Sequence, residues 1–298
     1  MPAELVNVSR AERVFALRTC SAFDGLTTTE LWRVGATLRP RQCAAGESVT
    51  LPGMPLAALE FVVSGRVEVD APSGRQVRGP RDVIGDLVDL LDEAPAPHAV
   101  AIEPTLTLEF DRAALEDLLE DDFSIFLGVL RAAARRLARR GGHDSNVRSW
   151  KREGASPKSR RSVLDLVERV LLLQEDVHFR RCEIAPLATL AEGATEFVLG
   201  PGEPLFPAGA AADHFVVLAS GRAVVRTHSR SFRVGAGEEF GMYEALAGET
   251  HWPSATAGTT LRGLRIAASS LIDVIEDYPS FGLGLLRALA HEIEESAS

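Results

Sequence analysis

Residues 83–101 contain the residue types that could hold an anion. The sequence there reads VIGDLVDLLDEAPAPHAVA: an apolar pair, a glycine turn, a short helix-forming run and a second apolar run. A helix N-terminus presents free backbone N–H groups and a partial positive charge, which is the chemistry of phosphate binding. The stretch contains no Arg or Lys. It therefore has the backbone of an anion site without the cation that such a site commonly uses.

No other residues form a catalytic or metal-binding set. His143, Asp144 and Ser145 are consecutive, and consecutive residues cannot face one another as a catalytic triad requires. His178 and Cys182 have the i, i+4 spacing that places two ligands on one helix face, but no third ligand stands near them. The glycine-rich stretches lack the Lys of a phosphate-binding Walker loop. We therefore expect neither enzymatic activity nor a bound metal.

Charge is distributed unevenly along the chain. The formal net charge of -10 disfavours a general polyanion-binding role, because binding to duplex DNA rests on many phosphate contacts. Between residues 131 and 161, however, eleven Arg or Lys face only two acids. This stretch fits either a solvated helix face followed by a flexible linker or a docking patch for an acidic partner. The candidate patch residues are Arg135, Arg136, Arg139, Arg140, Lys151 and Arg152.

Length and composition indicate an ordinary globular protein. With 298 residues, 46% of them hydrophobic, the chain can form about two domains. No apolar run approaches the length of about 18 residues that is needed to cross a bilayer, and the N-terminus does not read as a signal peptide. The three cysteines are scattered, which favours reduced thiols over a disulfide framework. We expect a cytoplasmic protein without membrane insertion.

The sequence repeats itself at a spacing of 156 residues without a gap. Gly85 corresponds to Gly241, residues 46–47 (GE) to 202–203, and residues 64–66 (SGR) to 220–222. Further matches keep the same register over more than a hundred residues, which chance does not do. The repeat predicts domains at 12–140 and 161–296, joined by a basic linker at 141–160.

Each copy predicts the same order of elements. A helical start, with Thr27 to Thr29 as candidate N-caps ahead of Glu30, precedes short β-type runs separated by glycine or proline turns. A long amphipathic helix follows, near 113–140 in the first copy and 269–295 in the second. The predicted fold class is mainly β with flanking helices: two tandem jelly-roll-like β-rolls, each ending in a long amphipathic helix.

These motifs carry a family resemblance. The segments LRPRQCAAGESVTLPG, LEFVVSGRVEV, VIGDLVDLL and LTLEFDRAALEDLL resemble the cyclic nucleotide-binding domain of the catabolite activator protein and of the regulatory subunits of cyclic-AMP-dependent kinase. TEFVLGPGEPLFPAG, HFVVLASGRAVV and EFGMYEALAGE resemble it again in the second copy. The resemblance implies an eight-stranded β-roll whose cassette holds the cyclic phosphate on backbone amides and one Arg, with a Glu on the ribose and a C-terminal helix that moves or dimerises.

Both cassettes depart from the family pattern. Pro95 and His251 stand at the position of the phosphate-binding Arg, and Asp86 and Met242 at that of the ribose-binding Glu. The candidate ligand residues are Gly85, Asp86, Leu87, Pro95, Ala96 and His98 in the first cassette, and Gly241, Met242, Tyr243, His251, Trp252 and Ser254 in the second.

The cost of these departures decides the expectation. Removing an Arg that pairs with a buried phosphate costs about 2–5 kcal/mol, whereas a helix N-terminus contributes about 0.3–1 kcal/mol. Cyclic AMP and cyclic GMP are therefore disfavoured as ligands. Asp86 also suits the first turn of a helix without any ligand, His251 fits at most a weak, acid-favoured anion site, and Trp252 either packs on the roll or stacks on a base.

We expect a non-enzymatic regulatory or scaffolding protein that acts through protein–protein interaction by way of its helices and basic linker. Two alternatives stay open: a sensor for a cyclic nucleotide or another small ligand, and a structural subunit of a larger assembly. A DNA-binding domain is not expected, because the sequence leaves no room for a recognition helix after either long helix. The two long helices are expected to pack together as an intramolecular pseudo-dimer, or to form a homo-oligomer.

Overall fold

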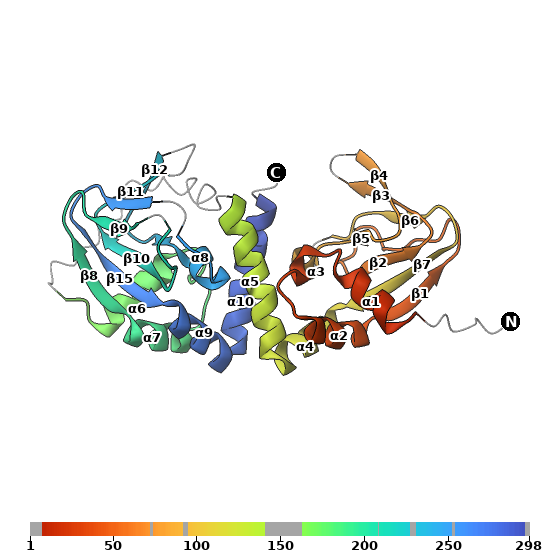
Figure 1. Cartoon of the computed structure of the whole chain (residues 1–298), viewed down its shortest axis with the longest axis horizontal. Helices are drawn as coiled ribbons and strands as arrows, with labels where there is room; N and C mark the ends of the chain where they lie inside the picture. Colours follow the sequence, from red (N-terminus) through yellow and green to blue (C-terminus); the bar gives the residue numbers. More distant parts are fainter. Residues whose placement is uncertain are drawn as a thin grey trace. The chain divides into compact units, whose positions relative to one another are not determined.

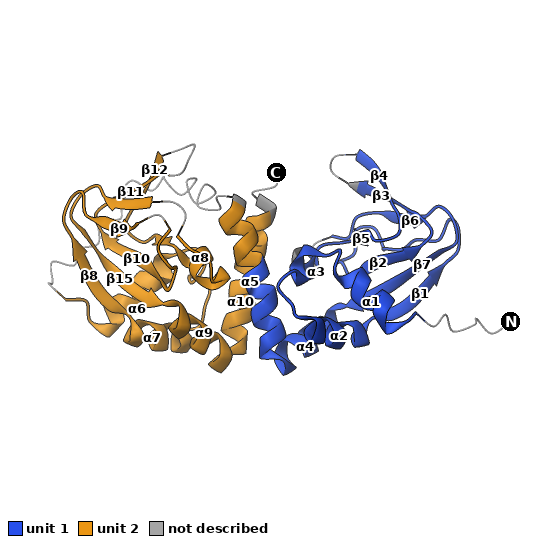
Figure 2. Ribbon diagram, in the orientation of Figure 1, with its two compact units in different colours: residues 1–132 blue, residues 133–298 orange. Residues whose placement is uncertain are grey.

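The structure of the chain is a computed structural model, which describes residues 8–71, 74–91, 95–140, 163–207, 209–226, 231–251 and 254–295 (Figure 1). The chain divides into two compact units, residues 1–132 and 133–298 (Figure 2). The division falls inside one helix, α5 (Phe123–Arg140), so that the last turns of this helix belong to the second unit. The predicted linker at 141–160 lies outside the described residues.

The first unit begins with two short helices, α1 (Arg10–Leu17) and α2 (Thr28–Thr37), separated by the 3₁₀ helix η1 (Ser21–Phe23). Thr27 caps α2: its side chain accepts a hydrogen bond from the backbone N–H of Glu30, and the Glu30 carboxylate accepts one from the N–H of Thr27. The predicted N-cap is therefore Thr27, and this reciprocal pair satisfies two N–H groups that the helix leaves unpaired.

Two antiparallel sheets form the body of the first unit, in the orders β1-β7-β2-β5 and β4-β3-β6. Their strands are β1 (Arg39–Cys43), β2 (Ala58–Ser64), β3 (Val67–Ala71), β4 (Gly74–Arg78), β5 (Val83–Ile84), β6 (Ala99–Ala101) and β7 (Thr105–Asp111). Helix α3 (Leu87–Leu91) lies between β5 and β6 in the chain, and α4 (Arg112–Asp121) and α5 follow β7.

The second unit has two four-stranded antiparallel sheets, in the orders β13-β10-β15-β8 and β12-β11-β14-β9. Its strands are β8 (Thr195–Leu199), β9 (Pro204–Phe206), β10 (His214–Ser220), β11 (Ala223–Arg226), β12 (Ser231–Val234), β13 (Glu239–Phe240), β14 (Ser254–Ala257) and β15 (Leu261–Ala267). Its helices are α6 (Leu166–Glu175), α7 (Ile184–Gly193), α8 (Met242–Ala247), α9 (Ala268–Asp277) and α10 (Pro279–Glu295).

The elements of the two units keep the spacing found in the sequence. Strands β1, β2, β5 and β7 and helices α2 and α4 recur 156 residues later as β8, β10, β13, β15, α7 and α9, with the same bounds at both ends. Side chains repeat as well: Arg13 Nη1 donates to the Leu38 carbonyl at 2.6 Å, and Arg169 Nη1 to the Ala194 carbonyl at 2.9 Å. Each arginine fastens the first helix of its unit to the residue after the second.

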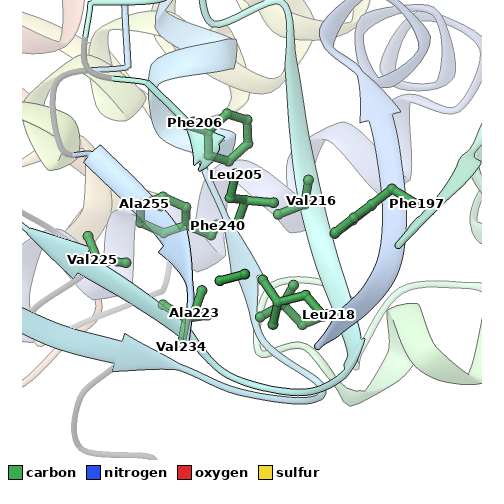
Figure 3. Packing of buried hydrophobic residues seen from close by; sticks show 12 residues of the cluster. Phe197, Leu205, Phe206, Val216, Leu218, Ala223, Val225, Val234, Phe240 and Ala255 are labelled. Atoms are coloured by element: carbon green, nitrogen blue, oxygen red, sulfur yellow. The ribbon is translucent and has the colours of Figure 1, made fainter. Parts of the chain in front are cut away.

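The space between the sheets is filled differently in the two units. Figure 3 shows the core of the second, where Phe197, Phe206 and Phe240 meet aliphatic side chains from both sheets. The corresponding core of the first unit has no aromatic residue among the described side chains: Cys43, Val49, Val62, Val67, Val69, Ile84, Ala99 and Ala101. The interior of the second roll is therefore the more bulky and more apolar of the two.

The apolar stripes of both long helices are buried. On α10, Phe281, Leu285, Leu289 and Ile293 are buried, and on α5 the same holds for Phe126, Val129, Leu130 and Leu137, whereas Ala133 of the same stripe is half-buried. The packing of α5 against α10 as a pseudo-dimer stays a prediction. Among the helices that the structure describes, none has the length and hydropathy needed to cross a membrane. Within the described part of the chain, Cys20, Cys43 and Cys182 form no disulfide.

Candidate functional site: the two glycine-turn cassettes

In each unit a glycine in the left-handed region connects a two-residue strand to the short helix. Gly85 has φ 89° and Gly241 has φ 94°, conformations that residues with a side chain rarely adopt. Neighbours also exclude a side chain: a Cβ on Gly85 would lie 2.7 Å from Leu56 Cδ2, and one on Gly241 would lie 2.8 Å from His251 Cε1. We call residues 83–101 and 239–257 the first and second cassettes.

Leucines anchor the short helix of the first cassette. Leu87, Leu90 and Leu91 are buried, and the backbone N–H of Leu90 donates to the Asp86 carbonyl at 3.1 Å. Asp86 is half-buried at the start of α3. The predicted neighbours Gly85, Asp86 and Leu87 therefore follow one another in a turn that enters a helix, as the sequence indicates.

Backbone pairing occupies the position where the resemblance places an arginine. Pro95 is exposed and forms an isolated antiparallel bridge with Pro55, and the N–H of Ala96 donates to the Met54 carbonyl at 2.8 Å. Proline has neither a backbone N–H nor a polar side chain to offer to a ligand. Residues 95 and 96 of the first cassette therefore pair with the backbone of residues 54 and 55 and provide no cation for a ligand.

His98 lies on the surface and pairs with an acid. Its Nδ1 atom is 3.3 Å from Asp70 Oδ2, and its carbonyl accepts the backbone N–H of Asp70 at 2.8 Å. Arg75 approaches the same carboxylate at 3.1 Å. His98 thus belongs to a surface ion cluster on β3 and β4, where exposed pairs contribute little to stability.

The second cassette is closed by its own side chains. Every residue of α8 is buried, including Met242 and Tyr243. His251 is 1% exposed and packs on Phe206, with ring centroids 3.9 Å apart and ring planes tilted by 31°. Its imidazole also contacts the bare face of Gly241. Burial lowers the pKa of His251, and the carboxylate of Glu244 opposes this only in part. His251 is therefore a neutral filling residue near pH 7.

Of the remaining predicted residues in this cassette, Ser254 begins β14 and is half-buried opposite Arg226. Trp252 lies outside the described residues.

A buried polar cluster in the second unit was not predicted from the sequence. It joins the turn after α6, strand β13, α8 and α10, and consists of Asp176, His178, Glu239, Tyr243 and Glu292. All five side chains lie in the interior, each at most 7% exposed. At the corresponding positions 156 residues earlier stand Cys20, Ala22, Val83, Leu87 and Arg136.

His178 lies at the centre of this cluster. Its Nδ1 atom is 2.9 Å from Asp176 Oδ1, and its Nε2 atom is 3.1 Å from Glu292 Oε2 and 3.0 Å from the Tyr243 hydroxyl. The Tyr243 hydroxyl donates to Glu292. Burial alone would lower the pKa of His178, but the carboxylates of Asp176, Glu292 and Glu239 raise it well above its usual value. His178 is therefore an imidazolium held between acids.

Cys182 and Tyr243, both named in the sequence analysis, contact this cluster. Residues 176–182 form turns instead of a helix, so His178 and Cys182 do not share a helix face. Cys182 Sγ contacts the His178 carbonyl at 3.6 Å, and burial raises the pKa of its thiol to about 11, which leaves it protonated. Tyr243, a candidate ligand residue of the second cassette, donates its hydroxyl to Glu292 of α10. Among the described residues, no group of three or more His, Cys, Asp or Glu could hold a metal.

Two arginines of the predicted basic patch, Arg135 and Arg139, form contacts within the second unit. Arg135 is half-buried: its Nε atom lies 3.0 Å from Glu249 Oε1, and its Nη2 atom donates to the Ala247 carbonyl at 3.3 Å. Arg139 reaches the same carboxylate at 3.8 Å and is largely exposed, while Arg136 is half-buried. The side chain of Arg140 and all of Lys151 and Arg152 lie outside the described part.

The first roll carries an ion pair where the second is apolar. Arg41 Nη1 lies 2.7 Å from Glu60 Oε1, and the same guanidinium donates to the Ser48 and Val49 carbonyls. Glu60 is 2% exposed, and burial raises its pKa against the pull of Thr107 and Arg41. The residues 156 positions later are Phe197 and Val216, both part of the aromatic core.

Comparison with known proteins supports the family indicated by these features. The chain is 30% identical over 130 residues to a CRP-like cAMP-activated global transcriptional regulator of Mycobacterium tuberculosis, an alignment that covers 41% of this chain and 58% of the relative. The chain thus spans little more than half the length of the curated relatives it matches.

Among solved structures, the chain is similar to the regulatory domain of Toxoplasma gondii PKA with cAMP, with a TM-score of 0.35 and 18% identity, covering 91% of this chain and 96% of that one. It is also similar to the N-terminal domain of a transcriptional regulator from Streptomyces coelicolor, with a TM-score of 0.39 and 23% identity, covering 42% and 93%.

A family model gives the most specific match, since it places residues 40–122, which include the whole first cassette, in the cyclic nucleotide-binding domain. The family model, together with the curated relative, therefore supports the cyclic nucleotide-binding domain family, with the model matched in the first unit.

Proposed function

We propose that this chain is a non-enzymatic regulatory protein in which neither cassette holds a cyclic nucleotide, and whose output is contact with another protein. The observation that carries the proposal is the absence of a cation in both cassettes: Pro95 is locked in a backbone bridge, and His251 is buried and neutral. The family match and the similarity to a cAMP-activated regulator support a regulatory role. The three scattered cysteines, which form no disulfide in the described part of the chain, fit a cytoplasmic location.

The free energy lost with the arginine is large enough to leave both cassettes without a bound cyclic nucleotide. The lost Arg–phosphate contact is worth about 2–5 kcal/mol, which is about thirtyfold to several-thousandfold in affinity. In the second cassette a ligand must in addition displace His251 from its packing on Phe206, which is part of the core. We take this second unit, with its repeated order of elements, to be a second copy of the domain, the two copies spanning 12–140 and 161–296.

Calorimetry on the whole chain tests the proposal. Cyclic AMP and cyclic GMP are each titrated into the protein, with 5′-AMP as a control for non-specific binding of a nucleotide. We expect no saturable heat at ligand concentrations up to about 10 μM, where an intact site would bind. Binding tighter than about 10 μM by either cyclic nucleotide would overturn the proposal.

The proposed output needs its own test. The curated relative is a transcriptional regulator, so DNA binding is examined as well, by anisotropy of a labelled duplex at two salt concentrations. Salt-dependent binding of the duplex would contradict a purely protein-directed output. Light scattering at high concentration tests the structural-subunit alternative, which a monomer contradicts.

A second candidate function is a sensor for a small polar ligand in the first unit. The observation that favours it is the polar pair inside that roll, where Arg41 and Glu60 stand at the positions of the core residues Phe197 and Val216 of the second. A thermal-shift screen of cyclic mononucleotides, cyclic dinucleotides and other small polar metabolites tests it, because a ligand that binds only the folded state raises the melting temperature. A hit that is lost in Glu60→Gln would place the site in this roll.

A further inference from the structure

Helix α8 is held at both ends by side chains from two long helices. In its first turn, the Tyr243 hydroxyl donates to Glu292 of α10 and lies 3.0 Å from His178 Nε2. At its last residue, the Ala247 carbonyl accepts from Arg135 of α5, whose Nε atom pairs with Glu249 at 3.0 Å. One short helix thus carries a polar contact to each of its larger neighbours.

The helix between these two contacts is short and packed on all sides. It has six residues, which is less than two turns at 3.6 residues a turn, and all six are buried. Left-handed glycines bound it on both sides, Gly241 with φ 94° and Gly248 with φ 66°. Loss of the last turn of so short a helix reaches the turn that carries Tyr243, because the two turns share residues.

Arg135 supplies what the end of α8 lacks. The last carbonyls of a helix have no partner inside the helix, and a positive charge there also interacts favourably with the helix dipole. The Arg135 guanidinium fills both roles, since it hydrogen-bonds the Ala247 carbonyl and remains paired with Glu249. Removing it deprives the Ala247 carbonyl of this donor and leaves Glu249 with the longer contact to Arg139, which favours fraying from the Ala247 end.

We propose that α8 couples α5 to α10, so that a displacement of Arg135 is felt at Glu292 without any ligand in the cassette. The Arg135 contact and the Tyr243 contact share one rigid helix, and neither can be lost without loosening the other. The first unit has no such coupling through α3, because Leu87 and Ala22 stand where the second has Tyr243 and His178. This coupling does not depend on the proposed function, since it needs neither an occupied nor an empty cassette.

Hydrogen exchange of backbone amides in the full chain, read by mass spectrometry, tests the coupling. Arg135→Gln removes the contact at Ala247. Arg139→Gln on the same helix is the matched control, because Arg139 is 72% exposed and its contact with Glu249 is long, at 3.8 Å. We expect Arg135→Gln to raise exchange of residues 285–293 of α10 by about fivefold or more, and Arg139→Gln by less than about twofold.

The reciprocal variant completes the test. Coupling free energies act in both directions, so Tyr243→Phe should raise exchange of residues 133–139 of α5 while the Arg135 side chain is intact. Faster exchange in α8 with unchanged α10 would overturn the proposal, as would equal effects of Arg135→Gln and Arg139→Gln. Should Arg135→Gln fail to fold, Glu249→Gln removes the same ion pair from the other side and decides the question by the same readout.

Discussion

His178 and Glu292 are 114 residues apart in the chain, and their side chains lie 3.1 Å apart inside the second unit. Around this pair stand two further carboxylates and the Tyr243 hydroxyl, all withdrawn from water. Buried ionic groups are seldom more stabilising than apolar residues of similar size, but they are strongly destabilising when one partner is lost. The cluster therefore fixes the position of α10 against α8, and substitution of any one of its members should be strongly destabilising.

The imidazolium makes the second unit sensitive to alkaline pH. Because the carboxylates raise the folded-state pKa of His178 well above 6.5, its contribution to stability is fully present below the unfolded value near 6.5. As the pH rises above that value the unfolded chain loses the proton first, and the contribution is lost by the time the folded pKa is passed. We expect the midpoint urea concentration for unfolding of the second unit to decrease as the pH is raised from about 6 to about 9. Hydrogen exchange on peptides of this unit measures the midpoint.

His178→Gln is the variant that isolates this effect. A glutamine keeps hydrogen-bonding capacity but does not titrate, so the variant should be less stable at pH 6 and nearly independent of pH over the same range. His98→Gln is the matched control, because His98 is exposed on the other unit. A wild-type slope that persists in His178→Gln would show that another group causes it.

Alanine substitutions at Gly241 and Gly202 distinguish the cost of backbone strain from the cost of steric crowding. Both have φ near 90°, but a Cβ on Gly202 meets nothing within 4 Å, whereas one on Gly241 lies 2.8 Å from the His251 ring. Gly202→Ala should cost about 1–2 kcal/mol from the left-handed backbone alone. Gly241→Ala should cost about 1–3 kcal/mol more, because it overpacks the cassette. Equal losses in urea unfolding would show that His251 yields freely and that the cassette is not tightly filled.

The elements of the fold were largely readable from the sequence, because each depends on local signals. The Thr27 cap, the glycine turns and the apolar stripe of α10 each involve residues close together in the chain, and the 156-residue repeat shows several elements twice, among them β1, β2, β5 and β7. The cassettes were located in the same way, by Gly85 and Gly241.

The polar cluster and the role of Arg135 could not be read in this way. His178, Tyr243 and Glu292 come from three elements, and each alone looks like a surface or helix residue. One signal was present in the aligned copies: polar residues in the second stand where the first has Cys20, Ala22, Val83 and Leu87. A coordinated change from apolar to polar residues, at positions of which Cys20 and Leu87 are buried in the first unit, indicates a buried network, although it does not say which residues touch.

We expect that the ion pair of Arg41 and Glu60 in the first roll can be replaced by the apolar residue types found at the corresponding positions of the second. Arg41→Phe alone leaves Glu60 buried without its cation and should cost about 2–4 kcal/mol. Arg41→Phe with Glu60→Val, which installs the residue types of Phe197 and Val216, should recover stability to within about 1 kcal/mol of wild type. Exchange of first-unit peptides in urea measures both. Arg39→Phe is the control, since Arg39 is 72% exposed in its pair with Asp111. A double variant no more stable than Arg41→Phe would contradict an interchangeable interior.

Restoring an arginine should act differently in the two cassettes. Pro95 is exposed, so Pro95→Arg places a guanidinium beside the Gly85 turn with little disturbance of the core, and we expect cyclic AMP affinity to rise by at least about tenfold in calorimetry. His251→Arg should give no gain, because the new side chain must enter the space that His251 shares with Phe206 and Gly241, both of which are in close contact with the ring. Circular dichroism checks that both variants are folded. A folded Pro95→Arg without a gain would mean that the missing cation is not what excludes the nucleotide from the first cassette, whereas a gain in His251→Arg would mean that the second cassette opens more easily than its packing indicates.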